Sequence, residues 1–519
     1  MSPRGLELKA LLLLCLLLAW TPALAGFEGH LRAVAAHTDR ALGTPGEAAA
    51  AKHVSKVFKG LPESLGAATG RQDFITPVRV FESASLNVGG VELPVRPLYA
   101  NALAPESLAG GHEAELVFAG EGRLEDFDGK RVAGNIVLMY LDSGGGWLHA
   151  ANLGARALVY LDRGGEAIPR LRFRDKEELT PVDFPRFWIP AAEFESRLGP
   201  AAALNGRPAR LECRTQWAKG RASNLWCFIP GQDPALAEEL LMVEAFLDGS
   251  RYVPGQAPAA DEAVSLATLL DLAEGFGASP PRRPVLLLAT SGHGNMLAGL
   301  REAVWALTTK KKELAAELEE MEKLGADANA TAALLETGRL SGGSPAEDGL
   351  VLAAIQTEIR NEVERINVAL RLARKDAAAN APRIKELAAR KLLLRRVGWE
   401  ASLAGLDQEA MAAVRGFVPA ALDHARRRAA DIGDRLAGLR SSLKLNKQAD
   451  GRRVAAAVSL HLSSHGNAVG SVDDGWLFRL VPTVNRSKLY ANIRPVLDAA
   501  AREFPGSYQD LLEIGRAHV

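Results

Sequence analysis

Acidic and histidine residues occur where apolar runs of the sequence end. Asp248 follows the apolar run 240–246, and His293 follows the apolar run 285–290. Carboxylate and imidazole groups serve as zinc ligands and as general bases, so such residues could support metal-dependent hydrolysis. We take His293 and Asp248 as candidate catalytic residues. The candidate metal ligands are Asp261, His293, His461 and His465.

The runs that carry these residues predict a strand–helix–strand unit. Residues 240–246 and 285–290 have the length and apolar character of buried strands. Between them, residues 261–276 have apolar side chains at helical spacing and begin with acidic residues, which suit a helix N-terminus. In open α/β sheets, functional sites lie at the carboxyl ends of the strands. We therefore expect Asp248 and His293 to lie at one edge of a sheet.

Three short motifs of this unit resemble those of a known family. They are Phe246-Leu247-Asp248, Asp261-Glu262-Ala263-Val264-Ser265 and His293-Gly294. Their order resembles the core of the di-zinc aminopeptidases of peptidase family M28. In that family a strand ends in His-x-Asp, a helix begins with Asp-Asn-x-Ser-Gly, and a second strand ends in Glu-Glu. The resemblance implies an α/β fold with a mixed sheet flanked by helices.

The resemblance also indicates which site residues are replaced. Phe246 stands where the family has its first metal-binding His, and Gly294 stands where it has a metal-binding Glu. Neither side chain can donate a lone pair to zinc. His293 replaces the catalytic Glu, and it could act as a base only on water that a metal activates. The usual two-metal mechanism therefore does not follow from this sequence.

Other positions keep a side chain that can bind metal. The resemblance implies that Asp248 orients the missing His and that Asp261 bridges two metals. His461 lies where the family has a metal-binding Asp, and His465 follows it closely. Together with His293, these residues could form a single-metal site. The alternative is that the histidines are surface or loop residues hydrogen-bonded to backbone groups.

Three interpretations of function remain open. In the first, the chain is a non-catalytic M28-like protein that keeps its fold for peptide or protein binding and has no cofactor. In the second, it is a zinc-dependent aminopeptidase or hydrolase with an altered His/Asp metal site. In the third, it is a structural or assembly protein that acts through a helical arm. A zinc titration separates the first two.

Length, composition and charge limit the class of protein. The chain has 519 residues, of which 48% are hydrophobic and 24% are charged, as in folded globular proteins of several domains. The formal net charge is zero, which argues against a general nucleic-acid binder. We therefore expect no nucleic-acid partner.

The first 25 residues resemble a secretory signal peptide. Arg4 and Lys9 form a positive region, an apolar run follows at 10–20, and Ala23-Leu24-Ala25 is a small-residue cleavage site. We expect cleavage after Ala25 and export to the periplasm or the extracellular space. The alternative is an uncleaved anchor, and only in that case do we expect a membrane partner.

The rest of the chain divides into segments of different pattern. We expect N-terminal helices of the core at 26–73, a β-rich domain at 74–208, two parts of the core at 209–300 and 451–512, a helical insertion at 301–450, and a non-native tail at 513–519. Residues 26–73 contain Gly43-Thr44-Pro45-Gly46, a turn that resembles one near the start of many M28 enzymes.

Residues 74–208 resemble a protease-associated (PA) domain. The features that carry this resemblance are the turn Phe127-Asp128-Gly129-Lys130, the strand at 135–140, the short helix that leads to Gly154, and a return strand at 187–190. The resemblance implies substrate gating or the binding of a peptide or protein ligand. Trp147 and Trp188 are expected to pack in the core.

The insertion at 301–450 has apolar residues at helical spacing, with Glu, Lys and Arg on the other faces. Breaks at 338–345 and 377–382 separate the predicted helices. We expect a helical hairpin or a small bundle. It is either an arm that binds a partner or a solvated lid without one.

Cys213 and Cys227 remain after removal of the signal segment. They lie on runs 210–217 and 223–229, which we expect to be strands joined by a turn at Lys219-Gly220-Arg221. Export permits a disulfide between them, and two buried thiols are the alternative.

Overall fold

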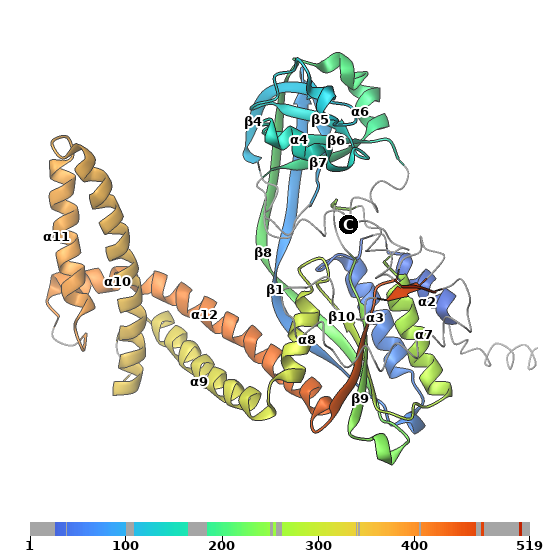
Figure 1. Cartoon of the computed structure of the whole chain (residues 1–519). Coiled ribbons are helices and arrows are strands. Elements are labelled where there is room, and N and C mark those ends of the chain that lie inside the picture. Colours follow the sequence, from blue (N-terminus) through green and yellow to red (C-terminus); the bar gives the residue numbers. More distant parts are fainter. Residues whose placement is uncertain are drawn as a thin grey trace, which may run out of the picture. The chain divides into compact units, whose positions relative to one another are not determined.

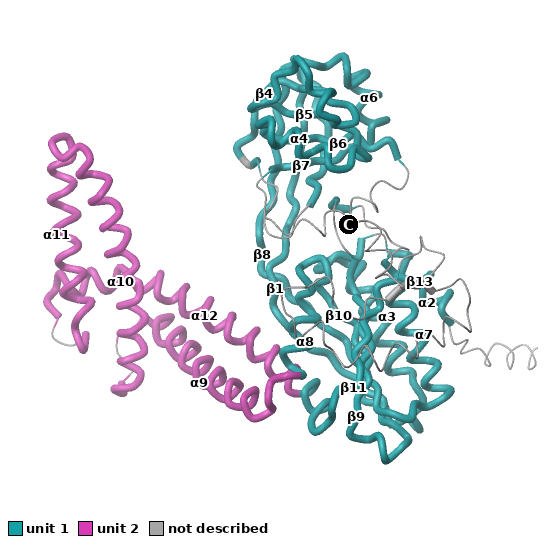
Figure 2. Tube along the Cα trace, in the orientation of Figure 1, with its two compact units in different colours: residues 1–307, 444–519 teal, residues 308–443 magenta. Residues whose placement is uncertain are grey.

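A computed structural model describes residues 26–37, 39–99, 108–164, 184–249, 253–255, 262–338, 340, 343–403, 406–462, 469–471 and 508–510. The expected signal segment, the expected tail, Asp261 and His465 lie outside these residues. The chain divides into two compact units (Figure 2), one of residues 1–307 and 444–519 and the other of residues 308–443. Among the described helices, none is both long and apolar enough to cross a bilayer.

The larger unit is an α/β structure, as predicted. Its main sheet has 11 strands among the described residues, in the order β11-β9-β10-β8-β4-β5-β6-β7-β3, with β1 paired to β8 and β2 paired to β1. The strands are β1 (Ala68–Val88), β2 (Val91–Pro94), β3 (Arg96–Pro97), β4 (Leu108–Phe118), β5 (Ile136–Tyr140), β6 (Ala157–Asp162), β7 (Arg186–Pro190), β8 (Pro208–Ile229), β9 (Glu239–Phe246), β10 (Val285–Thr290) and β11 (Arg453–Leu460). A short separate pair consists of β12 (Val469–Ser471) and β13 (Tyr508–Asp510).

The predicted strand–helix–strand unit is confirmed. Strands β9 and β10 are parallel neighbours, and the helix α7 (Val264–Ala278) connects them in the sequence. Every residue of β10 is buried, because successive side chains point to opposite faces and both faces are covered. One face packs on α7 and on α3 (Pro45–Lys59), and the other packs on α8 (Ala298–Thr308) (Figure 1). The N-terminal helix α2 (Gly26–Ala35) also contacts α7.

The strand after the helical insertion is also confirmed. β11 pairs in parallel with β9, with Ser459 opposite Glu244 and Leu460 opposite Ala245. Three parallel strands, β11, β9 and β10, therefore end at the same edge of the sheet. The predicted site residues follow these ends.

The prediction of two strands with a turn at Lys219-Gly220-Arg221 is wrong. β8 runs without interruption from Pro208 to Ile229, and β1 pairs with it along nearly its whole length. Gly220 lies opposite Thr76, where the side chain of Val78 leaves no room for a Cβ atom. The glycine therefore serves close packing of two strands and not a turn.

The proposed disulfide between Cys213 and Cys227 is wrong for the same reason. The two residues lie on one strand, in register with Ala84 and Thr69, and they are not bonded to each other. A strand rises about 3.3 Å per residue, which places them roughly 45 Å apart, whereas a disulfide needs Cα atoms within about 7 Å. Both are buried, and burial raises the pKa of the Cys227 thiol to about 12.

Strands β4 to β7 form a parallel part of the sheet with a core on each face. Ile136 and Leu138 of β5 face one core, and Val137 and Met139 face the other. The helix α6 (Ala191–Leu198) covers the first core and α4 (Trp147–Asn152) covers the second. Short 3-10 helices lie at Glu63–Leu65, Leu124–Phe127, Gly144–Gly146, Ala201–Leu204 and Pro234–Leu236.

The smaller unit is helical, as the spacing of its apolar residues predicts. It contains α9 (Lys311–Glu336), α10 (Pro345–Ala373), a 3-10 turn (Arg374–Asp376), α11 (Ala381–Gly398) and most of α12 (Gln408–Ala449). Ser344 caps α10 by accepting the N–H of Glu347 at 3.3 Å. An apolar core that includes Ile355, Ile359, Leu394 and Val414 joins α10, α11 and α12.

Candidate functional site

Three aromatic side chains meet at the edge where β9, β10 and β11 end. The ring of Phe246 is stacked on that of His293, with centroids 4.3 Å apart. His461 meets both rings edge to face, at 5.4 Å from Phe246 and 5.2 Å from His293. The parallel register of the three strands positions these residues, since each follows or ends its strand. Phe246 is only 2% exposed, so its ring is part of the core.

Asp248 lies beside this cluster and is 2% exposed. Its Oδ1 accepts the backbone N–H of His293 at 3.0 Å. Burial raises the pKa of Asp248 well above its usual value, against the opposing effect of that hydrogen bond, and the carboxylates of Glu47 and Glu262 raise it further. Through its hydrogen bond to His293, Asp248 ties the end of β9 to the loop after β10.

A buried cation accompanies these carboxyl groups. Arg40 is 2% exposed and donates to the carbonyl of Val34 at 3.3 Å. Burial lowers the pKa of Arg40, while the charges of Glu262 and Asp248 act to raise it. The backbone carbonyl of Arg40 accepts the N–H of Gly249 at 2.9 Å, which fixes the loop after β9. A Cβ atom on Gly249 would come within 2.9 Å of a Glu262 oxygen, so the backbone of Gly249 packs closely against the side chain of Glu262.

Glu47 reaches the same region from α3. Its Oε1 accepts the hydroxyl of Ser291 at 2.6 Å, and its Oε2 accepts the N–H of Gly43 at 2.6 Å. Thr44 caps the helix by accepting the N–H of Glu47, so the predicted Gly43-Thr44-Pro45-Gly46 turn places this carboxyl group. Burial raises the pKa of Glu47, and the two hydrogen bonds oppose that shift.

A buried amide network holds the end of β10. The Oδ1 atom of Asn224 accepts the N–H of Ser291 at 3.1 Å, and its Nδ2 donates to Gln72 at 2.9 Å and to the carbonyl of Gly299 at 2.8 Å. A Cβ atom on Gly299 would lie 2.3 Å from Asn224 Oδ1, so this close approach requires glycine. The network fixes the backbone that leads to His293.

Glu244 joins all three parallel strands from within β9. It accepts the hydroxyls of Thr290 on β10 and Ser459 on β11. Burial raises its pKa, and the two hydroxyl hydrogen bonds oppose the shift. In the sequence, the position of Glu244 inside the apolar run 240–246 indicates that this acidic side chain has hydrogen-bonding partners on neighbouring strands.

A small cavity of about 40 Å³ lies next to Asp248. Gly294, Arg79 and Tyr99 are among its lining residues, and the Arg79 guanidinium lies 3.9 Å from the centre of the Tyr99 ring. This volume holds a few water molecules and is far below the roughly 300–1,000 Å³ of typical small-molecule sites.

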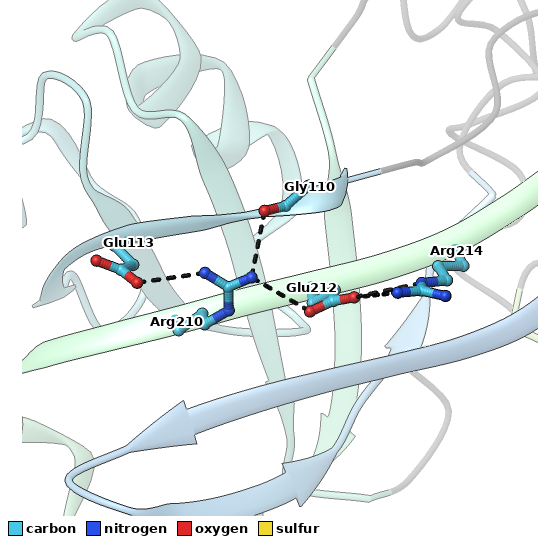
Figure 3. A network of polar contacts seen from close by, with 5 residues as sticks. All are labelled: Gly110, Glu113, Arg210, Glu212 and Arg214. Carbon is cyan, nitrogen blue, oxygen red and sulfur yellow. Dashed lines mark hydrogen bonds and ion pairs between the residues drawn. The ribbon is translucent and has the colours of Figure 1, made fainter.

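A larger groove, of about 960 Å³, lies on the β4–β8 part of the sheet. Its lining carries both charges, from Glu113, Glu115, Arg131, Arg197, Arg207 and Arg210. Figure 3 shows Arg210 held between Glu113 at 3.2 Å and Glu212 at 3.5 Å, with the carbonyl of Gly110 also at 3.2 Å. Arg131 pairs with Glu115 at 2.8 Å. Arg197 and Arg207 are exposed and have no acidic partner among the described residues.

The structure brings together Asp248, His293 and His461 of the predicted site. Asp261 and His465 lie outside the described residues. His293 and His461 are two nitrogen donors, whereas a catalytic zinc takes three protein ligands. Within the described ranges, no group of three or more His, Cys, Asp or Glu side chains could hold a metal ion. The described residues alone therefore do not make a zinc site.

Sequence reasoning did not find Arg40 and Glu262 as members of this region. Glu262 directly follows the candidate ligand Asp261, and Arg40 precedes the Gly43-Thr44-Pro45-Gly46 turn. No local pattern indicates that the two would be buried near each other, because their proximity depends on tertiary packing: Arg40 lies between α2 and α3, and Glu262 directly precedes α7.

No protein-family model and no curated protein matches this chain. Solved structures that it resembles include an aminopeptidase from Aneurinibacillus (18% identity, TM-score 0.35), a zinc aminopeptidase from Bacillus subtilis (17%, 0.40) and a peptidase M28 precursor from Shewanella amazonensis (17%, 0.37). The alignments cover 56%, 56% and 57% of this chain and 68%, 65% and 68% of those proteins.

Proposed function

We propose that this chain is an exported, M28-like protein that is catalytically impaired and acts in peptide or protein binding. The observation that carries the proposal is the packing of Phe246. Its buried ring packs against both His293 and His461, with ring centroids 4.3 Å and 5.4 Å away, at the strand end where the family has a metal-binding His. A hydrolase needs that space for a metal with an open position for water.

The charges around the cluster support the same proposal. The buried guanidinium of Arg40 supplies a fixed positive charge beside Asp248 and Glu262. A protein cation thus compensates acidic groups that a metal would otherwise balance.

Ligand binding is assigned to the groove of the PA-like segment 74–208 and the adjoining start of β8. The groove has the volume of a ligand site, and Arg197 and Arg207 present exposed guanidinium groups in it. Such groups pair with carboxylates, so acidic peptide segments are the expected ligands.

Two assays test the proposal. The purified protein with added zinc should release no amino acid from aminoacyl-nitroanilides. Labelled acidic peptides should bind more weakly to Arg197→Glu/Arg207→Glu than to Arg123→Glu/Arg156→Glu, a control with equal charge change on exposed residues of the same segment. Zinc-dependent cleavage that is lost in His293→Ala would refute catalytic impairment. Equal peptide binding by both double variants would refute the assignment of the groove.

The second candidate function is a zinc-dependent hydrolase with an altered site. The observation that favours it is the approach of the His293 and His461 rings to 5.2 Å. His293 and His461 would hold the ion, and a third ligand would have to come from Asp261 or His465. Bound zinc would act as a Lewis acid and lower the pKa of a water molecule. Calorimetric binding of one zinc per chain, absent in His293→Ala, would favour this function.

A further inference from the structure

The helical unit carries a concentrated positive charge at one end. Residues 365–396, which form the end of α10 and nearly all of α11, contain ten Lys or Arg residues and two acidic residues. The segment thus has a net charge of +8, while the whole chain has a formal net charge of zero. α10 and α11 lie side by side and are joined by the turn Arg374–Asp376 (Figure 1). We call residues 365–396 together with Trp399 the basic hairpin.

Few of these charges are balanced within the protein. Arg365 and Arg390 pair with Glu362, and Arg396 pairs with Asp407 at 2.7 Å. The other seven have no acidic partner among the described residues, and they are Arg371, Arg374, Lys375, Arg383, Lys385, Lys391 and Arg395. All but Lys391 are exposed. By contrast, three arginines of α12, at 426, 435 and 440, each pair with a glutamate of α9.

Exposed apolar side chains occur on the same hairpin. Trp399 is 84% exposed and Leu392 is 74% exposed, the two highest values for large apolar side chains in the described part of the chain. Val368 and Leu372 are exposed as well. In the described part of the helical unit, every exposed large apolar side chain is therefore one of these four.

Two basic residues of α11 share a helix face with Leu392 and with Trp399, which directly follows the helix. Leu392 and Trp399 are seven residues apart, and Lys385 and Arg395 lie at the helical spacings that place them on that same face. The opposite face of α11 is already used, because Leu394 and Val397 are buried against α10 and α12. The outer face is therefore available to a partner.

We propose that the basic hairpin docks on an anionic lipid surface. Phosphate head groups are complementary to the unpaired Lys and Arg side chains, which contribute about a fivefold affinity gain each near such a surface. Trp and Leu on the same face enter the boundary between head groups and acyl chains, where the amphipathic indole ring is favoured. A nucleic acid or an acidic protein would use the charges but would leave Leu392 and Trp399 without a role. This contact does not require a membrane anchor at residues 1–25.

Sedimentation of the full-length protein with lipid vesicles tests the proposal. Binding to phosphatidylcholine vesicles that contain phosphatidylglycerol is expected, with little binding to phosphatidylcholine alone and a decrease as salt is added. The triple variant Arg371→Glu/Arg383→Glu/Lys385→Glu should bind at least about a hundredfold more weakly. The control Lys312→Glu/Lys323→Glu/Arg415→Glu changes the net charge equally at exposed positions outside the hairpin and should bind like the parent protein.

A second variant separates lipid from other polyanions. Leu392→Ser/Trp399→Ser keeps every charge and should lose about tenfold in vesicle binding, with heparin binding unchanged. Far-ultraviolet circular dichroism should show the parental helix content in all three variants, because the substituted side chains are exposed. Equal binding to neutral vesicles, no binding to either vesicle, or equal loss in both triple variants would overturn the proposal. Unchanged vesicle binding by the Ser variant would reassign the hairpin to a general polyanion.

Discussion

Replacing Phe246 by alanine tests whether the strand-end cluster is packed core or an open site. The ring is 2% exposed and contacts both His293 and His461. Replacing a buried Phe by alanine lowers the free energy of unfolding by about 3–5 kcal/mol. Each aromatic contact contributes about 0.5–1.5 kcal/mol of that decrease. Because His461 is exposed and can move toward the vacated space, we expect the lower part of this range, about 3–4 kcal/mol in the free energy of unfolding.

Urea unfolding followed by tryptophan fluorescence measures this loss. Trp226 is a suitable reporter, because it is buried on β8 next to β10. Phe27→Ala is the matched control, since Phe27 is 39% exposed and its loss should cost less than about 1 kcal/mol. A loss below about 1 kcal/mol for Phe246→Ala would refute the reasoning. It would mean that the ring covers a space which a ligand or metal normally fills.

Three other predictions follow from the structure. Phe246→His should place a third imidazole beside His293 and His461. The variant should therefore bind zinc more tightly than the parent protein in a calorimetric titration. Equal affinity would mean that the three rings cannot bind one ion together. Replacing residues 308–443 by a short linker should remove most of the helical circular dichroism signal and leave a cooperative thermal transition of the sheet unit; an unfolded product would show that the helices are needed for the core. Burial raises the pKa of Asp248 and Glu244 above their unfolded values, so the stability that protonation contributes is complete below pH ~4 and is lost as pH rises through the folded pKa values. The free energy of unfolding of the Asp248→Asn/Glu244→Gln variant should therefore fall less steeply than that of the parent between pH 5 and pH 8. The two slopes should differ by up to about 1.4 kcal/mol per pH unit for each group. Equal slopes for the two proteins would contradict the prediction.

Chemical labelling gives a further check on the corrected cysteine assignment. The pKa of Cys227, raised to about 12 by burial, leaves few thiolates near pH 8, so iodoacetamide should react slowly with the folded protein and rapidly with the denatured one. Peptide mapping after denaturation without reductant should find both Cys213 and Cys227 alkylated. Recovery of a peptide that joins the two would contradict the single-strand assignment of β8.

Much of the local structure could be predicted from the sequence. The apolar runs at β9 and β10 and the helical spacing of α7 indicated the βαβ unit, and the spacing beyond residue 308 indicated helices. These predictions succeeded because burial of one face or both faces imposes a period on the sequence itself. The placement of Asp248 and His293 at one sheet edge follows from the same unit.

The sequence by itself determined which elements form and that polar groups follow the strand ends. Only the tertiary structure decided what those groups contact. Arg40, Glu47 and Glu262 come from segments far apart in the chain, and their burial near Asp248 depends on helix packing against the sheet. The single strand β8 was misread because a Gly between polar residues is typical of a turn, whereas here its missing Cβ lets β1 pack closely. A strand and a hairpin share local sequence preferences, and pairing with β1, more than 100 residues away in the sequence, selects between them.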